Sequence, residues 1–417
     1  MGLRSRLGGV FYGYWVLLGA FTLHFLDSGI YFYGFSVFYT PIMAEFGWSS
    51  AVTAGAVSLS RLEGGLEGPV VGYLIDKYGA RKILAIGAFL TGLGFIAMIW
   101  VDNVWMLYII YGGLLSIGYN TGFSHSLATI VNQWFIRKRS RAMSIYAIAA
   151  GIGGALIVPL LAKSIALYGW RMTAIYCGLV FWLAGLPMAF IFRNRPEDMG
   201  LHPDGEDPHR YADPVDGGVT VSEPEPEFTT MEALRSPTFR WLLLGESFRT
   251  FLLGSIVLHQ IPHLLTLGIG QETAASLLGL MILVSIPGRL ILGTLGDFVS
   301  KRLLLVAAML TQGLGVLIFA YATDIVHIYA FALVYGLAYG GAIPLLMAYR
   351  GELFGRKRFA SISGIMAPFK MIGNVAGPVF AGYIYDVTGS YQFAFLTFTM
   401  LATLSAASFY LVKSERI

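Results

Sequence analysis

The chain has 417 residues, of which 56% are hydrophobic and 12% carry a charge. A soluble domain needs more charged residues to cover its surface, so this composition excludes an ordinary soluble protein and indicates a membrane protein. The formal net charge of +4 does not indicate nucleic-acid binding, because basic loops on one side of a membrane account for it.

Twelve segments are apolar and long enough to cross a bilayer, which takes about 20 residues per helix. They predict an all-α membrane protein with twelve transmembrane helices. In chain order, the segments are residues 12–38, 50–74, 82–101, 105–131, 142–164, 171–192, 239–265, 273–296, 302–321, 327–349, 360–384 and 391–412.

Lysine and arginine residues gather in alternate loops, with Arg171 as the main exception. Basic loops of multi-pass proteins stay in the cytoplasm, so we expect both termini to be cytoplasmic. The protein itself is expected to lie in the plasma (inner) membrane, in contact with membrane lipid. The basic clusters are Arg4 and Arg6; Lys77, Arg81 and Lys82; Arg137, Lys138, Arg139 and Arg141; Arg193 and Arg195; Lys301 and Arg302; Arg356, Lys357 and Arg358; and Lys413 and Arg416.

One long polar stretch divides the chain into two halves. Between Pro196 and Glu232 it contains eleven acidic residues, six prolines and one arginine. Such a composition cannot bury an apolar core, so residues 194–237 are expected to form a flexible, acidic cytoplasmic linker. This linker separates an N-terminal six-helix bundle, residues 1–193, from a C-terminal six-helix bundle, residues 238–417.

A charged loop occurs twice, once in each half. The first copy is Gly72-x-Leu74-x-Asp76 followed by a basic cluster, and the second is Gly293-x-Leu295-x-Asp297 followed by another, 221 residues later (Asp76 to Asp297). Further landmarks return after 219 residues, such as Pro159 and Pro378. The repetition predicts two six-helix pseudo-repeats, which are typical of membrane transporters.

The repeated loops are expected to act as gates. Their glycines let helices approach closely, and their charged residues can form charge-assisted hydrogen bonds that hold one conformation closed. The alternative is that these residues only fix the topology. The expected gating residues are Gly72, Asp76, Arg81, Gly293, Asp297 and Arg302.

These motifs resemble those of a known family. The run Gly72-x-Leu74-x-Asp76-x-x-Gly79-x-Arg81-Lys82 resembles the loop signature of the major facilitator superfamily. Within that superfamily, Phe135-x-Arg137-Lys138-Arg139-x-x-Ala142 and Gly151-x-Gly153-Gly154 are similar to the fifth-helix signature of the monocarboxylate transporters, and residues 34–48 to the end of their first helix. The resemblance implies a secondary transporter that works by alternating access.

Two cations inside predicted helices point to an anionic substrate. A charge at the bilayer centre costs about 2.5–3.5 kcal/mol, and the sequence neighbours of Arg289 and Lys370 offer no counter-ion. The resemblance implies the same roles: monocarboxylate transporters have a substrate-binding arginine matching Arg289, and oxalate–formate antiporters add a lysine matching Lys370. The alternative is that each cation pairs with Glu246 or Glu63 across the bundle.

Other polar residues near the helix centres are expected to line the substrate site or, alternatively, to pack between helices. Glu246 and Arg249 are expected to form a local ion pair, because they are three residues apart on one helix. The further candidates for substrate binding are Tyr119 and Asn120 in helix four, Tyr335 and Tyr339 in helix ten, and Asn374 in helix eleven.

A proton site is expected in the N-terminal half. His24 and Asp27 lie on one face of helix one, and a desolvated carboxyl group near a histidine is suited to proton exchange. A polar contact between helices is the alternative. The acidic residue that monocarboxylate transporters often place one turn before the helix-eight arginine is Ser285 here, so protons would have to use Asp27 or Glu63.

The sequence therefore predicts a transporter of a small organic carboxylate, such as lactate or pyruvate, coupled to protons and functional as a monomer. The alternatives are a carboxylate exchanger of the oxalate–formate type, an exporter of lipophilic compounds, or a receptor that does not transport. No arrangement typical of an enzyme, a metal site or a nucleotide site is present, so no cofactor is expected.

Overall fold

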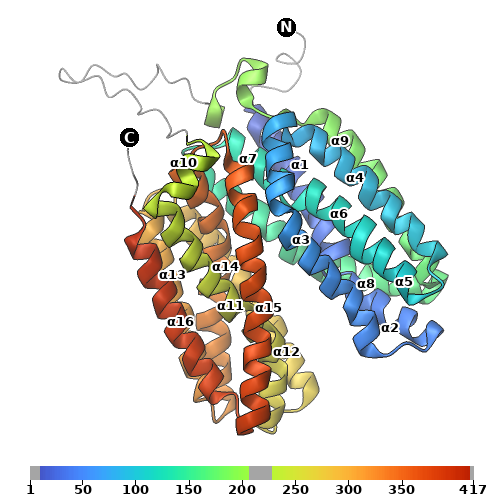
Figure 1. The fold of residues 1–417 in the computed structure, drawn as a ribbon, viewed down its shortest axis with the longest axis vertical. Helices are drawn as coiled ribbons and strands as arrows, with labels where there is room; N and C mark the ends of the chain where they lie inside the picture. The colour runs from blue at the N-terminus through green and yellow to red at the C-terminus, as the bar shows by residue number, and fades with distance from the viewer. Residues whose placement is uncertain (1–9, 206–227, 414–417) are drawn as a thin grey trace.

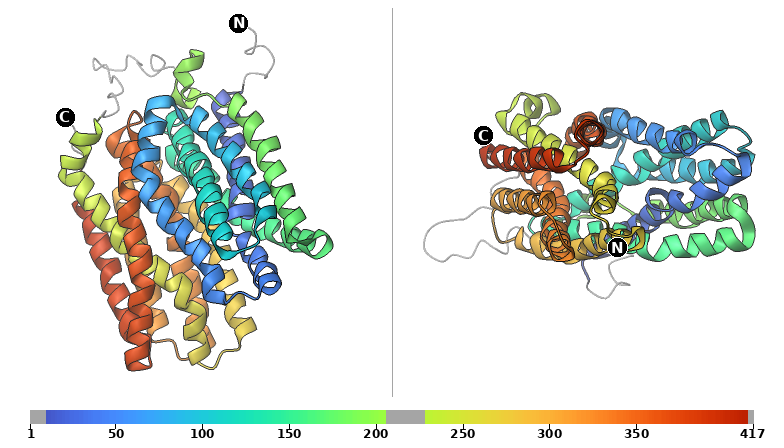
Figure 2. Two further views of the ribbon diagram at one scale, coloured as in Figure 1. Left: turned by 45° about the vertical axis from the view of Figure 1, so that its right-hand side comes forward. Right: turned by 90° about the horizontal axis from the view of Figure 1, so that it is seen from below.

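The computed structural model describes residues 10–205 and 228–413, and within these ranges the chain is helical and has no β-strand. The two halves form two groups of helices that lie side by side (Figure 1), and the view from below separates the same groups (Figure 2). They meet at the end where α10 lies, the linker side, and diverge toward the opposite end, the far side. The predictions for Arg4, Arg6, Arg416 and the middle of the linker, residues 206–227, lie outside the described residues.

The N-terminal half consists of the first six crossings. Helices one, four and six contain π-helical turns, which are often found at functional sites. The elements are α1 (Tyr12–Asp27), η1 (Ser28–Phe32) and α2 (Phe35–Phe46); α3 (Ser50–Tyr78); α4 (Ala80–Ala97) and η2 (Met98–Trp100); α5 (Val104–Leu107), η3 (Tyr108–Leu115), α6 (Ser116–Tyr119), η4 (Asn120–Ser124) and α7 (Ser126–Trp134); and α8 (Arg139–Val180), η5 (Phe181–Gly185) and α9 (Leu186–Ile191).

The C-terminal half supplies the other six crossings, and a short helix precedes them. That helix is α10 (Thr230–Arg235). The crossings are α11 (Pro237–Thr266), α12 (Gln271–Leu295), α13 (Lys301–Ala320), α14 (Ile325–Phe354), α15 (Phe359–Thr388) and α16 (Gln392–Leu411).

The prediction of twelve helices in two pseudo-repeats is confirmed. Eight helical stretches among the described residues are long and apolar enough to cross a membrane by length and composition. One of these, Arg139–Ile191, contains two crossings, because the backbone turns sharply at Gly169 (φ 78°, ψ 163°). The remaining crossings, α3, the α5–α7 stretch and α15, carry polar side chains such as Glu63, Asn120 and Lys370.

Several helices are longer than the apolar segments predicted. Helix one continues to Phe46, and helix ten continues to Phe354 rather than ending near residue 349. Arg350 therefore lies inside α14, one residue beyond the end of the predicted apolar segment. Apolar windows miss such ends because polar residues at the membrane surface remain helical.

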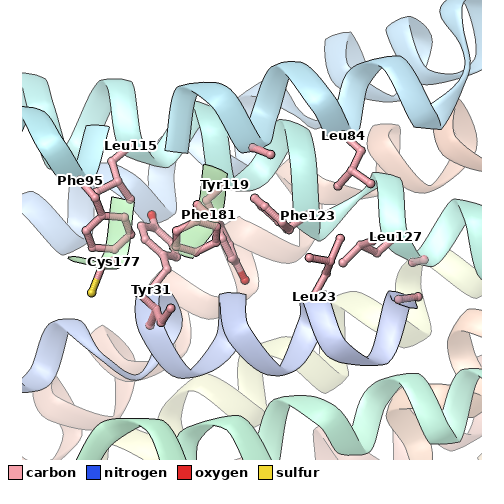
Figure 3. Close-up of a cluster of buried hydrophobic side chains, with 14 of the residues drawn as sticks. Leu23, Tyr31, Leu84, Phe95, Leu115, Tyr119, Phe123, Leu127, Cys177 and Phe181 are labelled. Carbon is pink, nitrogen blue, oxygen red and sulfur yellow. The ribbon is translucent and has the colours of Figure 1, made fainter. Parts of the chain in front are cut away.

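A hydrophobic core holds the N-terminal half together. Leu23, Leu84, Phe123 and Phe181 are almost completely buried, and they come from different crossings. Figure 3 shows these side chains pointing into the space between their helices, with Tyr31 and Tyr119 between Phe95 at one end of the cluster and Leu127 at the other. Two further clusters fill the C-terminal half, so each half has apolar cores of its own. The domain boundaries 1–193, 194–237 and 238–417 remain a prediction.

The first part of the predicted linker is folded rather than flexible. Two short 3-10 turns, η6 (Pro196–Met199) and η7 (Pro203–Gly205), lie against the N-terminal half. The buried Asp204 carboxylate accepts hydrogen bonds from the backbone N–H groups of Ile136, Arg137 and Lys138, at 3.0, 2.9 and 3.2 Å. Composition missed this contact, because a single carboxylate bonded to three N–H groups can fix a polar segment.

Candidate functional site

Asp76, from the first repeated loop, binds a helix of the other half. Its Oδ2 accepts a hydrogen bond from the backbone N–H of Ser361 at 2.9 Å. Ser361 is in the first turn of α15, whose unpaired N–H groups and helix dipole favour a negative charge. Asp76 on α3 therefore caps α15 across the boundary between the halves.

Asp297, from the second loop, makes the corresponding contact in the opposite direction. It accepts from the backbone N–H of Ser140 at 2.9 Å and from Arg141 Nε at 2.6 Å, at the start of α8. A Cβ atom on Gly72 would clash with the Ala360 carbonyl, and one on Gly293 would clash with Ser144, so both loops need glycine to bring the halves together. Both predicted gates thus lie at the contact between the halves.

The two loop arginines have partners within their own halves. Arg81 Nε donates to the Ala189 carbonyl at 2.8 Å. Arg302 stacks on the Tyr410 ring, with 5.6 Å between the guanidinium carbon and the ring centroid. The basic partner of Asp297 is instead Arg141, which lies in the first turn of α8. Any gating role of Arg81 or Arg302 remains a prediction.

Contact between α3 and α15 ends partway across the bundle. Gly65 of α3 lies directly against Met371 of α15. One turn further toward the far side, the same helix faces carry Arg61 and Asn374, and both side chains are exposed. The halves are therefore joined on the linker side and separated beyond Gly65, so Arg61 and Asn374 face the opening.

Arg289 lies at the boundary between the halves and has no acidic partner among the described residues. Its side chain is buried, with 4% exposed, and Nη1 donates to the Ala147 carbonyl of α8. Its Nε has no hydrogen-bond partner, and Ser285 donates to the Ile282 carbonyl instead. Tyr33 of the N-terminal half is close enough to interact electrostatically with Arg289 and Tyr339.

Lys370, by contrast, has a counter-ion, so the expectation of an unpaired lysine is wrong. Glu246 Oε2 of α11 lies 3.9 Å from Lys370 Nζ, and Glu246 Oε1 lies 3.0 Å from Arg350 Nε of α14. The orientation of the second contact is that of an ion pair rather than a hydrogen bond. The sequence did not show this arrangement, because the three residues come from three helices and Arg350 lies just beyond the predicted apolar segment.

Arg249 adds a third cation to this group. The expected Glu246–Arg249 pair does not form, since no ion pair within 4.0 Å joins them, and Arg249 Nε and Nη2 are buried without a partner. Arg249 is nevertheless close enough to interact electrostatically with Glu246, as well as with Tyr339, Tyr335 and Arg350. We call Glu246, Arg249, Arg350 and Lys370 the cationic cluster: it has three cations and one carboxylate.

The predicted aromatic and amide candidates divide into two groups. Tyr335 is fully buried, its hydroxyl has no partner, and its ring stacks on that of Tyr339 beside the cationic cluster. Tyr119 instead stacks on Tyr31 inside the N-terminal half, with 4.0 Å between ring centroids. Asn120 donates to Glu63 at 3.3 Å. Binding of substrate by any of them remains a prediction.

Asp27 and His24 form the expected pair. The Asp27 side chain is completely buried, and its Oδ1 lies 3.1 Å from His24 Nδ1. Ser28 also donates to Asp27 at 2.9 Å, and the His24 ring stacks on Tyr146. Both hydrogen-bond partners, His24 and Ser28, lie within one turn of Asp27, which makes the pair a compact unit.

Comparison with known proteins fits this arrangement. The family model described as Major Facilitator Superfamily matches residues 16–323 and 250–416. The chain belongs to the major facilitator superfamily. It is an integral, multi-pass membrane transporter, and the two capped loops are the signature loops of this superfamily fold.

This transporter also resembles the monocarboxylate transporters, as predicted. Monocarboxylate transporter 13 of Bos taurus is 26% identical over 391 residues, which cover 92% of this chain and 85% of the relative. Monocarboxylate transporter 2 of Homo sapiens is 22% identical over 421 residues, or 97% and 85%. A crystal structure of the human organic anion transporter MFSD10 (TETRAN) shares the fold, with a TM-score of 0.70 at 16% identity, over 95% of this chain and 99% of that one.

The cationic cluster of this transporter should depend on Glu246 for stability. Glu246→Gln is expected to lower the free energy of unfolding by about 3–5 kcal/mol, because the buried Arg350 and the partly exposed Lys370 then lose their carboxylate. Thermal unfolding of the purified protein in detergent measures the change. The double variant Glu246→Gln/Lys370→Met should recover part of the loss. An unchanged melting temperature of Glu246→Gln would contradict the role of Glu246 as the counter-ion of Arg350 and Lys370.

Proposed function

We propose that this transporter moves a small organic carboxylate, such as lactate or pyruvate, across the plasma (inner) membrane by alternating access coupled to protons. The observation that carries the proposal is the excess of positive charge in the C-terminal half. Arg289, Arg249, Arg350 and Lys370 lie inside the bundle with one carboxylate, Glu246, within ion-pair distance among the described residues.

Physical chemistry links this excess to a carboxylate substrate. Buried charges are costly unless they are paired, so unpaired guanidinium nitrogens favour an anion between them. A guanidinium group matches the two oxygens of a carboxylate, and we assign Arg289 and Arg249 this role. Tyr335 and Tyr339 can donate hydroxyl hydrogen bonds to the same anion, and Lys370 supplies further positive charge. The names of the relatives, monocarboxylate transporters and an organic anion transporter, support the same substrate class.

The contact between the halves supports alternating access. The linker side is closed by the capping contacts of Asp76 and Asp297, and the halves separate toward the far side beyond Gly65 and Met371. The basic loops lie on the linker side, which we therefore assign to the cytoplasm. In this assignment the structure is an outward-facing state, and both capping contacts must break when the cytoplasmic side opens.

Exchange of a dicarboxylate is the second candidate function. It is favoured by the three cations of the cluster, because an anion with two carboxylates needs more positive charge than a monocarboxylate does. The two candidates predict different substrates for the same site, so a substrate panel separates them.

Counterflow in proteoliposomes tests the proposal. Purified protein is reconstituted with unlabelled lactate, pyruvate, formate or oxalate inside, and uptake of the labelled compound is followed with and without a pH gradient. We expect counterflow of at least one monocarboxylate, with net uptake driven by an inward proton gradient. Absence of counterflow for every carboxylate, with specific binding retained, would favour a receptor, and uptake of lipophilic cations instead would favour an exporter.

Lys370→Met should show which charge class the site accepts. In a monocarboxylate–proton symporter the change should alter the pH dependence of uptake, because the charge balance around Glu246 changes. In a dicarboxylate exchanger it should abolish oxalate exchange and spare part of formate exchange. Initial rates over a range of pH measure both, with Lys413→Met, at the end of the last helix, as control. Unchanged substrate range and pH profile would make Lys370 structural.

A further inference from the structure

Two glutamates lie together on α3 in the N-terminal half. Glu63 and Glu67 are one helical turn apart, and their carboxyl groups are hydrogen-bonded to each other. Glu63 Oε2 also accepts hydrogen bonds from Ser116 Oγ and from Asn120 Nδ2, both on the fourth crossing. Glu67 Oε1 is buried and has no hydrogen-bond partner.

A hydrogen bond between two carboxyl groups requires one proton, because ionised carboxylates only accept. Two carboxyl groups that share a hydrogen bond repel each other when both are charged, so they hold one proton as a pair. The donors Ser116 and Asn120 stabilise the negative charge on Glu63. Glu67 is therefore the protonated member, and it donates to Glu63.

The surrounding groups do not neutralise this pair. Tyr31 of helix one is close enough to interact electrostatically with both glutamates, and its hydroxyl bonds to Ser60. Arg61, on α3 itself, is exposed and faces the opening. Lys370, on α15, is directed to Glu246, and His125 of the fourth crossing interacts with Lys370 and Arg350. Among the described residues, no cation forms an ion pair with Glu63 or Glu67.

The position of the pair connects it with the movement of the two halves. Between the two glutamates, Gly65 touches Met371 of α15, and one residue after Glu67, Gly68 touches Ala367 of α15. This is where the α3–α15 contact ends and the halves begin to separate. Opening of the linker side must break this contact, which changes the access of water to α3.

We propose that Glu63 and Glu67 form the proton-carrying pair of this transporter. The inference rests on the proposed function for its coupling to substrate. In the state closed on the linker side, the pair holds one proton taken from the far side. When the linker side opens, α15 separates from α3 and the proton passes to water on that side. The pair then returns to the first state with a net charge one unit more negative.

Asp27 offers the sharpest comparison, because it is a completely buried acid of the same half. Its carboxylate is already held by His24 and Ser28, a base and a neutral donor. A carboxylate beside a histidine can keep its charge and need not take up a proton. We therefore assign the coupling of protons to transport to Glu67, and a local structural role to Asp27.

Transport with and without a proton gradient tests the pair. Glu67→Gln should abolish uptake driven by an inward proton gradient and keep counterflow of the same carboxylate within about threefold of the wild type. Uptake driven by the proton gradient should be kept in Asp27→Asn. It should also be kept in the control variant Glu352→Gln, which removes an exposed partner of Lys301 at the surface. Loss of coupling in Asp27→Asn but not in Glu67→Gln would overturn the assignment.

An infrared difference spectrum provides a second measurement that needs no substrate. In the wild type, raising the pH should remove the carbonyl band of a protonated carboxylic acid. The band should be absent in Glu67→Gln and, if that variant does not fold, altered in Glu63→Gln. A wild-type band that both variants keep unchanged would show that the pair holds no proton. If no carboxylate shows counterflow but the band disappears in Glu67→Gln, the proposed function fails and the proton site stands.

Discussion

Arg289→Ala is expected to abolish carboxylate uptake while the protein remains folded. A hydrogen bond between a charged group and its partner contributes about 1.5–3 kcal/mol, so loss of the guanidinium should weaken substrate binding by roughly 10- to 150-fold. Arg289 is suited to this role because it is buried at the boundary between the halves, with Nε unpartnered. Its neighbour Tyr33 comes from the opposite half, so a ligand at this arginine would contact both halves.

Binding and counterflow of labelled carboxylate measure the effect, and size-exclusion profile and melting temperature report folding. Arg289→Lys keeps the charge but loses the planar fork, so we expect it to retain part of the binding. Arg193→Ala is a matched control, since this arginine bonds to nearby carbonyl groups on the linker side. Uptake at the wild-type level in well-folded Arg289→Ala would contradict substrate binding by this residue.

Asp76→Asn is expected to slow turnover far more than it weakens substrate binding. The asparagine oxygen can still accept from Ser361, but it lacks the charge that the start of α15 favours. A charge at a partly buried helix end contributes up to about 2 kcal/mol, so the closed state should lose population by up to roughly 30-fold relative to the open one. Asp76 lies at the linker side, away from the cationic cluster, so substrate affinity should stay nearly constant.

The pseudo-symmetry of the fold provides a second variant for the same test, at the corresponding aspartate of the other half. Asp297→Asn should have a similar effect, because Asp297 caps α8 in the same way and also binds Arg141. Maximal rates and equilibrium affinities, measured separately, distinguish a conformational step from a binding step. A large loss of affinity at an unchanged maximal rate, for either variant, would refute a gating role.

The sequence alone was sufficient for the fold. Each apolar segment that crosses the membrane must satisfy its backbone hydrogen bonds within its own helix, so twelve such segments indicate twelve helices. A motif repeated after half the chain length divides these helices into two equivalent halves. The signature loops therefore predicted the superfamily, and only the structure places the glycines and aspartates of these loops at the contact between the halves.

Residue contacts across the helices were harder to predict. Lys370 was expected to be unpaired because its neighbours in the sequence are apolar, yet Glu246 lies 124 residues earlier in the chain and 3.9 Å away in space. Arg350 was missed because the apolar segment ends before the helix does. In the sequence, Glu67 is only one more charged residue in helix two. Its contact with Glu63 depends on the face of the helix that carries both residues being turned away from lipid, which the sequence does not show.

The sequence by itself determined the number of crossings, the two pseudo-repeats and which residues carry charge inside the membrane. These follow from local rules, because hydropathy and helix length act on consecutive residues. Only the tertiary structure decided which charges meet: Asp76 with α15, Glu246 with Arg350 and Lys370, and Glu63 with Glu67. The physical reason is that the rotation of each helix about its axis, and the neighbour it faces, depend on packing across the whole bundle.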